Sequence, residues 1–419
     1  MRKVYRVYAI HIMKASHVIT LDPTVKQAQA LLRACGCARY AWNWGLAEWQ
    51  RQYLAGEKPN AFKVKLALNQ HRKSDLPWAY ESPKNAMEGA VRDLGRAFQN
   101  FFDSLSGKRK GPRMGYPQRK RRGQRDSFYV ANDKFSVRGL TAKLPVIGNV
   151  KLREPLRFAG KVLGGRVSLR AGRWFLSVQV ETEIRVPNVP VGTTLGVDLN
   201  MGNISTSDGE VIDTPRSHRA VSAQLRRANR MLHRRVRGSK NRAKAKLRLA
   251  RIHARIAYIR KDFLDKITTR LCRENQTVVI EDLNIAGIAR CRSLARSVLD
   301  GGFGMFRHMM EYKCARFGTK LVVALRWFPS SKRCSGCGAI KRDLSLSERL
   351  YCCDLCGLTI PRDTNAAMNL MQYPRLEGNW DTQVSKTTVE SRPLLDSMPC
   401  RASQLVEAVT NQCSQMSTS

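Results

Sequence analysis

The chain has 419 residues, a length that predicts two to four domains. Hydrophobic residues make up 43% of it, which is enough to build cores and excludes global disorder. Its formal charge of +41 comes from 74 Lys and Arg against 33 Asp and Glu. A chain this cationic repels itself unless a polyanion compensates, and nucleic acid is the expected polyanion. The alternative is a merely basic surface.

No apolar run reaches the roughly 18 residues that a transmembrane helix needs, so we expect no membrane partner. The N-terminal stretch lacks a small-residue cleavage pattern, and residues 4–12 are better interpreted as a first strand than as a signal peptide. Four of the 12 cysteines form two CxxC pairs, which favours metal binding in a reducing compartment. We therefore expect a cytoplasmic, nucleoid-associated protein of prokaryotic type.

Helical stretches follow the first strand. One opens with Asp22 or Thr24 as its N-cap, and another spans about residues 83–105, so a helical bundle is expected. The Gly-, Pro- and Arg-rich residues 106–125 predict a loop. Short strands punctuated by Gly and Asn then cover residues 127–186. This pattern is typical of a small barrel or an antiparallel sheet, which the first strand could join across the helical insertion.

An α/β pattern begins near Thr193. The predicted strands are 195–199, 204–206, 277–280 and 320–324, and the predicted helices are 217–273, 304–317 and one that starts near Asp363. A compact cysteine-rich stretch occupies residues 333–357. Beyond about residue 375 the chain is rich in Ser, Thr and Gln and is predicted to be disordered.

Three acidic residues stand out in this basic chain. Asp198 interrupts a buried strand, Glu281 ends the apolar run VVI, and Asp363 begins a helix. Converging carboxylates need a cation, and hard oxygen ligands with open water positions suit Mg²⁺ or Mn²⁺. Two such ions about 4 Å apart can hydrolyse a phosphodiester. The structural alternatives are a turn or cap role for Asp198, an N-cap role for Asp363, and an arginine partner for Glu281.

The four cysteines Cys334, Cys337, Cys353 and Cys356 have the spacing C-x₂-C-x₁₅-C-x₂-C. This spacing is in the zinc-ribbon range, and four thiolates make a closed tetrahedral site that is structural. Cys352 could replace Cys353 as a ligand, although the second pair would then be CxxxC. Redox chemistry of the CxxC pairs is the other alternative.

Two basic segments are candidates for contact with nucleic acid. Residues 216–261 contain seventeen Lys or Arg and no acidic residue, and the 106–125 loop adds a second cluster. The candidate residues are Arg119, Lys120, Arg121, Arg122, Arg234, Arg235, Arg237, Lys240 and Arg242. A solvated charged face is the alternative. Trp42, Trp44 and Trp49 could stack on bases, but packing in a helical core is preferred for them.

At these residues the chain resembles the TnpB family, transposon-encoded relatives of type V CRISPR nucleases. The resemblance lies in segments that occur in the family's order over about residues 1–372. They are CGCARYAWNWGL, GPRMGYPQRKRR, GVDLNMGN, the long basic stretch from RRVRGSK to ITTRL, VVIEDLNI, WFPSSKRCSGCG and RDTNAAMNL. Pro361 departs from the acidic residue that many members have before the Arg-Asp pair.

The resemblance implies a multidomain α/β plus β-barrel fold. Its parts are an N-terminal wedge-type barrel with an inserted helical bundle, and an RNase H-like (RuvC) nuclease domain with an inserted zinc ribbon. The corresponding ranges are 1–20 and 126–190 for the barrel, 21–125 for the recognition helices, 191–332 and 358–375 for the nuclease, 333–357 for the ribbon and 376–419 for the tail.

The resemblance also implies the activity. In the family, three acidic residues that match Asp198, Glu281 and Asp363 are catalytic, and a guide RNA from the transposon end pairs with DNA. We therefore expect an RNA-guided, Mg²⁺-dependent DNA endonuclease with structural Zn²⁺. Its partners would be guide RNA and double- and single-stranded DNA, and a monomer is favoured. The alternatives are a guided DNA-binding regulator without cleavage and a transposase that performs strand transfer.

Overall fold

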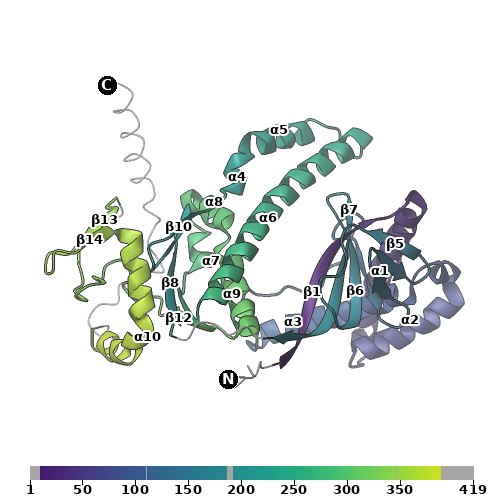
Figure 1. Cartoon of the computed structure of the whole chain (residues 1–419). Coiled ribbons are helices and arrows are strands. Elements are labelled where there is room, and N and C mark those ends of the chain that lie inside the picture. The colour runs from purple at the N-terminus through teal and green to yellow at the C-terminus, as the bar shows by residue number, and fades with distance from the viewer. Residues whose placement is uncertain (1–9, 110, 186–191, 346, 388–419) are drawn as a thin grey trace, which may run out of the picture. The chain divides into compact units, whose positions relative to one another are not determined.

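The computed structural model describes residues 10–109, 111–185, 192–345 and 347–387. Contacts divide these residues into two units, Ile10–Arg185 and the part from residue 192 onward (Figure 1). Residues 4–9 of the predicted first strand, and residues 388–419 of the predicted tail, lie outside the described residues.

The first unit contains a seven-stranded antiparallel sheet in the order β2-β6-β7-β1-β5-β4-β3. Its strands are β1 (Ile10–Asp22), β2 (Ser127–Ala131), β3 (Ser136–Arg138), β4 (Thr141–Leu144), β5 (Gly148–Leu152), β6 (Lys161–Arg170) and β7 (Arg173–Arg185). As predicted, the first strand joins this sheet across the helical insertion. It pairs with β7 and, at its end, with β5.

The predicted barrel does not close in the described residues. Closure requires the two edge strands to pair with each other. In the described residues β2 pairs only with β6, and the three-residue β3 pairs only with β4, so the ladder has two open edges. The antiparallel sheet, which the strand pattern also predicted, is the architecture that forms.

Helices α1 (Val25–Leu54), α2 (Ala61–Asp75) and α3 (Lys84–Leu105) cover this sheet, with the short 3₁₀ helix η1 (Pro77–Glu81) between α2 and α3. Thr24 is the N-cap of α1 and forms a capping box with Gln27, so Asp22 is not the cap. Helices and sheet share one hydrophobic core. Trp42 and Trp49 are buried in it, and Trp49 stacks on Phe98 with the ring centroids 4.1 Å apart.

The second unit contains a five-stranded mixed sheet in the order β10-β9-β8-β11-β12. Its strands are β8 (Thr194–Leu199), β9 (Asn203–Thr206), β10 (Val211–Asp213), β11 (Thr277–Glu281) and β12 (Lys320–Ala324). The central strand β8 is parallel to β11, which is parallel to β12, whereas β8, β9 and β10 are antiparallel. The four strands predicted for this region are confirmed.

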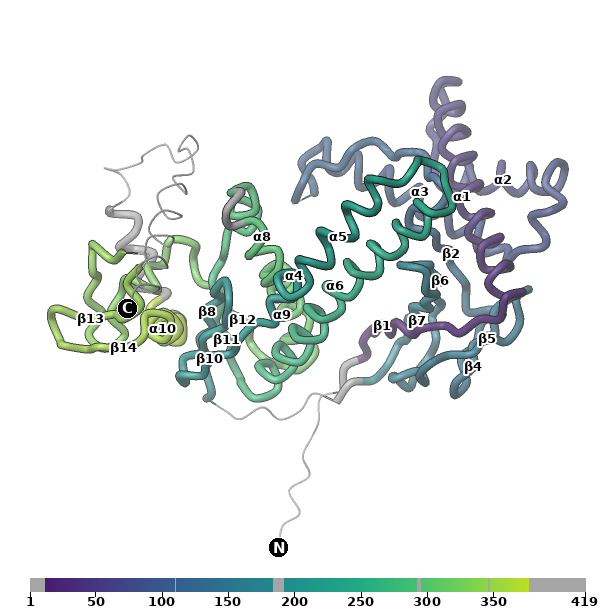
Figure 2. The backbone as a smooth tube through the Cα atoms, turned by 90° about the horizontal axis from the view of Figure 1, so that it is seen from above, coloured from purple at the N-terminus to yellow at the C-terminus, as the bar shows by residue number. Residues whose placement is uncertain are grey.

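Helices cover both faces of the second sheet. The helices of the second unit are α4 (Ser217–Ala220), α5 (Ser222–His233), α6 (Lys240–Glu274), α7 (Ile285–Ile288), α8 (Arg292–Gly301), α9 (Phe303–Phe317) and α10 (Arg362–Thr387). One core joins the sheet to α6 and α9, and another joins its opposite face to α10. Helices α5 and α6 run side by side as a hairpin (Figure 2). A two-stranded hairpin of β13 (Leu350–Cys352) and β14 (Thr359–Pro361) precedes α10.

The predicted tail begins at residue 376, which lies inside helix α10. Helix α10 continues to Thr387. Leu370 and Tyr373 are buried in the core beneath it, and Leu376 packs against that core. The helix therefore includes residues whose composition alone suggested disorder.

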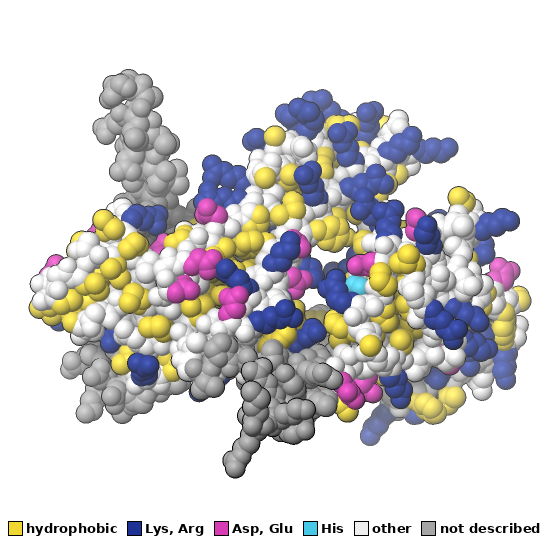
Figure 3. Space-filling model, viewed as in Figure 1, with side chains coloured by type: hydrophobic (Ala, Val, Ile, Leu, Met, Phe, Trp, Pro, Cys, Tyr) yellow, Lys and Arg dark blue, Asp and Glu magenta, His cyan; other side chains and the backbone are white. Residues whose placement is uncertain are grey.

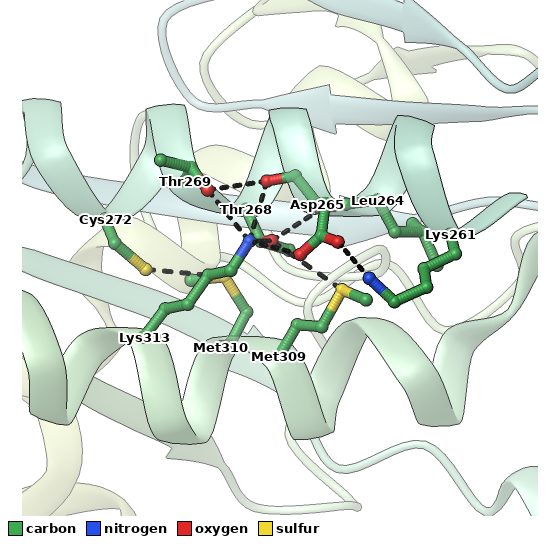
Figure 4. Close-up of polar contacts among 9 residues, drawn as sticks. All are labelled: Lys261, Leu264, Asp265, Thr268, Thr269, Cys272, Met309, Met310 and Lys313. Atoms are coloured by element: carbon green, nitrogen blue, oxygen red, sulfur yellow. Dashed lines mark hydrogen bonds and ion pairs between the residues drawn. The ribbon is translucent and has the colours of Figure 1, made fainter. Parts of the chain in front are cut away.

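A buried lysine joins α6 to α9 (Figure 4). Lys313 of α9 is 5% exposed. Its Nζ lies 2.7 Å from the carbonyl oxygen of Asp265, 3.0 Å from the carboxylate of Asp265 and 2.8 Å from the hydroxyls of both Thr268 and Thr269. Burial lowers the pKa of Lys313, and the Asp265 carboxylate opposes this change. All three ammonium protons therefore have acceptors.

We predict that Lys313→Met destabilises the second unit by about 2–4 kcal/mol, because Asp265 and two hydroxyls lose their buried partner. The measurement is the midpoint of thermal unfolding by circular dichroism. The matched control is Lys266→Met, which removes an exposed i,i+4 pair with Asp262 and should change stability by less than about 0.5 kcal/mol. Equal midpoints for the two variants would contradict the prediction.

Candidate functional site

Two of the predicted carboxylates lie at matching positions on neighbouring strands. Val197 of β8 pairs with Ile280 of the parallel strand β11, and Asp198 and Glu281 are the next residues on each. Val197 and Ile280 face the core beneath α6 and α9. Because side chains alternate along a strand, Asp198 and Glu281 point to the opposite face, which α10 covers.

The third carboxylate arrives through a close approach of α10 to β8. A Cβ on Gly196 would lie 1.9 Å from the carbonyl oxygen of Ala367 and 2.5 Å from the backbone nitrogen of Met371. Asp198 lies two residues after Gly196 on the strand, and Asp363 lies about one helical turn before Ala367 on the helix. Each step is about 6 Å, so the two carboxylates are brought alongside.

Electrostatics support one shared neighbourhood. Asp198 is 8% exposed. Burial, followed by the charges of Glu281 and Asp363, raises the pKa of Asp198 to about 8, although Asn200 donates a hydrogen bond of 3.0 Å to it. Burial also raises the pKa of Glu281, opposed by a hydrogen bond from the Ser330 hydroxyl. These carboxylates are therefore difficult to ionise together unless a cation is present.

The structure argues against the structural alternatives for these acids. Asp198 lies inside β8, and Asp363 lies inside α10, which begins at Arg362, so neither is a simple cap. Within the described residues, no arginine or lysine forms an ion pair with Glu281. The neighbouring Asp282 takes both nearby arginines, Arg307 and Arg326.

The oxygens of the three acids do not all lie within 4.8 Å of one another. In the described chain only the cysteine cluster meets that condition among groups of three or more His, Cys, Asp or Glu. The acids are therefore not arranged around one ion. A pair of ions about 4 Å apart does not need such a tight arrangement, because different carboxylates can bind different ions.

The four predicted cysteines come together. The Sγ atoms of Cys334 and Cys356 lie 3.6 Å apart, as do those of Cys337 and Cys353. A tetrahedral Zn²⁺ site with Zn–S bonds of about 2.3 Å separates its sulfurs by about 3.8 Å. Cys352 is exposed on β13 and does not belong to the cluster, so the CxxxC alternative is wrong.

Two asparagines that the sequence analysis did not single out connect this cluster to α10. Asn365 and Asn369 are fully buried. Asn365 accepts from the Ser335 backbone at 2.9 Å and donates to the Arg333 carbonyl at 2.7 Å. Asn369 donates to the carbonyls of Ser330 and Arg333 at 2.8 and 2.6 Å. Their i,i+4 spacing in RDTNAAMNL, which puts two amides on one helix face, was the available signal.

The α5–α6 hairpin presents most of its predicted basic residues to solvent. Arg234, Arg235, Arg237 and Lys240 are exposed around the break between the helices. Lys and Arg side chains gather over this hairpin in Figure 3. Arg242 differs, because it donates to the carbonyls of Leu232 and Arg235 and so holds the hairpin closed.

The predicted basic loop is similarly divided. Arg119, Arg121 and Arg122 are exposed. The Lys120 ammonium instead lies 3.7 Å from the centre of the Trp42 ring, and burial lowers its pKa. Asn43 also binds the Lys120 backbone through both ends of its amide. Lys120 therefore anchors the loop that presents its neighbours.

Among the described helices, none is both long and apolar enough to cross a membrane.

Comparison with known proteins identifies the family. A family model described as "Probable transposase" matches residues 176–292, and one described as "Cas12f1-like, TNB domain" matches residues 303–370. A "Helix-turn-helix domain" model matches residues 13–58, which here include most of β1 and the single helix α1.

A Streptomyces pristinaespiralis protein named "Putative RNA-guided DNA endonuclease" is 38% identical over 83% of this chain and 86% of its own length. The Escherichia coli protein "Putative RNA-guided DNA endonuclease InsQ" is 30% identical over 84% of this chain and 90% of its own length. This chain therefore belongs to the TnpB family.

A solved structure extends the likeness to the fold. The "Cryo-EM structure of the Cas12f1-sgRNA-target DNA complex" has a TM-score of 0.50 and 15% identity, and the match covers 83% of this chain and 82% of that one. At this identity the similarity concerns the mixed α/β fold alone.

We predict that Gly196→Ala lowers DNA cleavage roughly 100-fold, because the added methyl group displaces α10 and with it Asp363. Cleavage of a plasmid matching the guide RNA measures this. Gly304→Ala is the control, since its added Cβ would meet nothing closer than 3.7 Å. Wild-type cleavage by Gly196→Ala would show that the helix contact does not position the site.

We also predict that Asn369→Leu destabilises the junction between the cysteine module and α10 by about 2–4 kcal/mol, because two buried carbonyls and Arg333 lose their partner. Thermal unfolding and elemental zinc content are the measurements, and zinc should remain bound. Thr364→Ala on the same helix, at a half-buried position, is the control. A variant as stable as wild type would contradict the role given to the amide.

Proposed function

We propose that this protein is an RNA-guided, Mg²⁺-dependent DNA endonuclease associated with a transposable element. The observation that supports the proposal is that Asp198 and Glu281 lie side by side at the ends of two parallel strands, with Asp363 close enough for its charge to raise the pKa of Asp198, in a chain of this family. Ligand sites of α/β sheets form at such strand ends.

The three carboxylates are the proposed catalytic and metal-binding residues. The donor set fits Mg²⁺ or Mn²⁺, since all three are hard oxygen ligands and their mutual repulsion requires a cation. Two bound ions would activate the attacking water and stabilise the leaving oxygen of the scissile phosphodiester. Asn200 and Ser330 hold Asp198 and Glu281 by hydrogen bonds and so fix the direction of their oxygens.

Structural Zn²⁺ is the proposed occupant of the cysteine cluster. Four thiolates leave no open coordination position, so the site supplies folding free energy and not catalysis. Its amide contacts with α10 give the module a means to hold the helix that carries Asp363.

The proposed domains follow the family. Residues 1–20 and 126–190 form the wedge-type part, here supported by an open sheet, and residues 21–125 form the recognition helices. Residues 191–332 and 358–375 form the RNase H-like, RuvC-type nuclease, interrupted by the ribbon at 333–357. The mixed sheet with acidic strand ends supports this division.

The proposed partners are a guide RNA from the transposon end and double- and single-stranded target DNA, bound by a cytoplasmic monomer. The relatives are named as RNA-guided endonucleases, and the net charge of +41 suits two polyanions. The proposed phosphate contacts are Arg119, Arg121, Arg122, Arg234, Arg235, Arg237 and Lys240.

The test uses the full chain purified with its bound RNA, which is sequenced to design a plasmid target with randomised flanks. We predict that Asp198→Ala lowers Mg²⁺-dependent cleavage at least about 1,000-fold while RNA binding is retained, because the central carboxylate is lost. Asp213→Ala, an exposed acid on the same sheet, should cleave like wild type.

Cleavage by Asp198→Ala at the wild-type rate would defeat the catalytic assignment. Target binding without cleavage by wild type would favour the guided regulator. Joined DNA products instead of simple breaks would favour a transposase.

A further inference from the structure

A cavity of about 550 Å³ lies on α1, within the first unit. Its principal lining residues are Arg39, Tyr40, Asn43, Trp44, Trp78 and Arg119. We infer that this cavity binds an unstacked nucleotide of the bound nucleic acid, with the base against the aromatic rings and the phosphate against the arginines. The inference rests on the proposed function for the presence of nucleic acid.

The aromatic wall is held rigid before any ligand binds. Trp44 stacks on His71 with the rings 5.1 Å apart and 8° from parallel. The Tyr40 hydroxyl lies 2.8 Å from Nε2 of His71, and the Tyr40 ring meets Trp78 edge-on at 5.3 Å. His71 is itself held by Asp75 at 2.8 Å. A planar ligand would therefore find fixed rings and would cost little ordering entropy on binding.

The three tryptophans of α1 differ in burial, and this difference points to Trp44. Trp42 and Trp49 are core residues, exposed by 8% and 9%. Trp44 is only half-buried and lines the cavity. Trp78, which also lines the cavity, is 42% exposed, although its large apolar ring favours burial. A base that stacks here would cover the apolar area that the fold leaves open.

The charges around the cavity favour an anion. No acidic side chain lines it. Arg119 has no carboxylate partner in the part of the chain that the structure describes, and Arg39 has a single ion pair, with Asp126 at 3.3 Å. Asn43 binds both sides of the Lys120 backbone and so fixes the neighbouring Arg119 at the wall. Guanidinium groups beside aromatic rings match the phosphate and base of one nucleotide, whereas a cationic ligand is disfavoured.

The experiment measures binding of oligo-U, oligo-dT and a fully abasic strand of equal length to the full chain in EDTA by fluorescence anisotropy. If a base stacks in the cavity, Trp44→Ala should lower the affinity for oligo-U or oligo-dT roughly tenfold and leave the affinity for the abasic strand unchanged. Trp44→Phe should restore affinity to within about threefold, because it keeps a ring. Arg119→Gln should weaken all three strands and reduce their salt dependence.

Tyr53→Ala is the control, since Tyr53 is an exposed aromatic residue farther along α1 and should have no effect. Circular dichroism checks that each variant is folded, and Trp44→Phe tests the ring should Trp44→Ala unfold. The oligomer that loses more affinity identifies the source of the nucleotide as RNA or DNA. If Trp44→Ala lowers the affinity for base-containing and abasic strands equally, or lowers neither, the inference is overturned. Failure of wild type to bind any strand would instead count against the proposed function.

Discussion

The close contact between α10 and β8 at Gly196 determines how the second unit is assembled. No side chain fits between Gly196 and the backbone of Ala367 and Met371. The helix can therefore lie directly on the strand, bury Leu370 and Tyr373 on the sheet, and bring its first turn to the carboxyl end of β8. Without that approach Asp198 and Glu281 would still be neighbours, because the pairing of β8 with β11 fixes their positions. Asp363 would not be held near them.

The same helix binds the cysteine module. Asn365 and Asn369 project from α10 and fix the backbone at Ser330, Arg333 and Ser335. This segment contains Cys334 of the cluster, and Ser330 holds Glu281. One helix is therefore bonded to both the cluster and the segment that orients a carboxylate. The cysteine loop, the helix that carries Asp363 and the segment that binds Glu281 are therefore joined by direct hydrogen bonds.

Patterns of local origin were predictable from the sequence. The Thr24 cap, the strands that carry Asp198 and Glu281, and the cysteine spacing follow from neighbours a few residues apart. Features that depend on distant partners were not predictable. The open sheet depends on which strands pair, the placement of α10 depends on the core beneath it, and Arg242 turns inward because carbonyls of the facing helix end are within reach. Composition and periodicity contain little information about such contacts.

The adjacent acids Asp282 and Glu281 differ in how much positive charge lies beside them. Asp282 is neutralised by Arg307 and Arg326, and their contacts lower its pKa. Glu281, one residue earlier, receives only a hydroxyl, and Asp198 receives only an amide. A chain with 74 basic residues could have paired these acids. Among the described residues neither acid has an ion pair, and burial raises the pKa of both, so the charged form of these carboxylates is costly unless a cation binds.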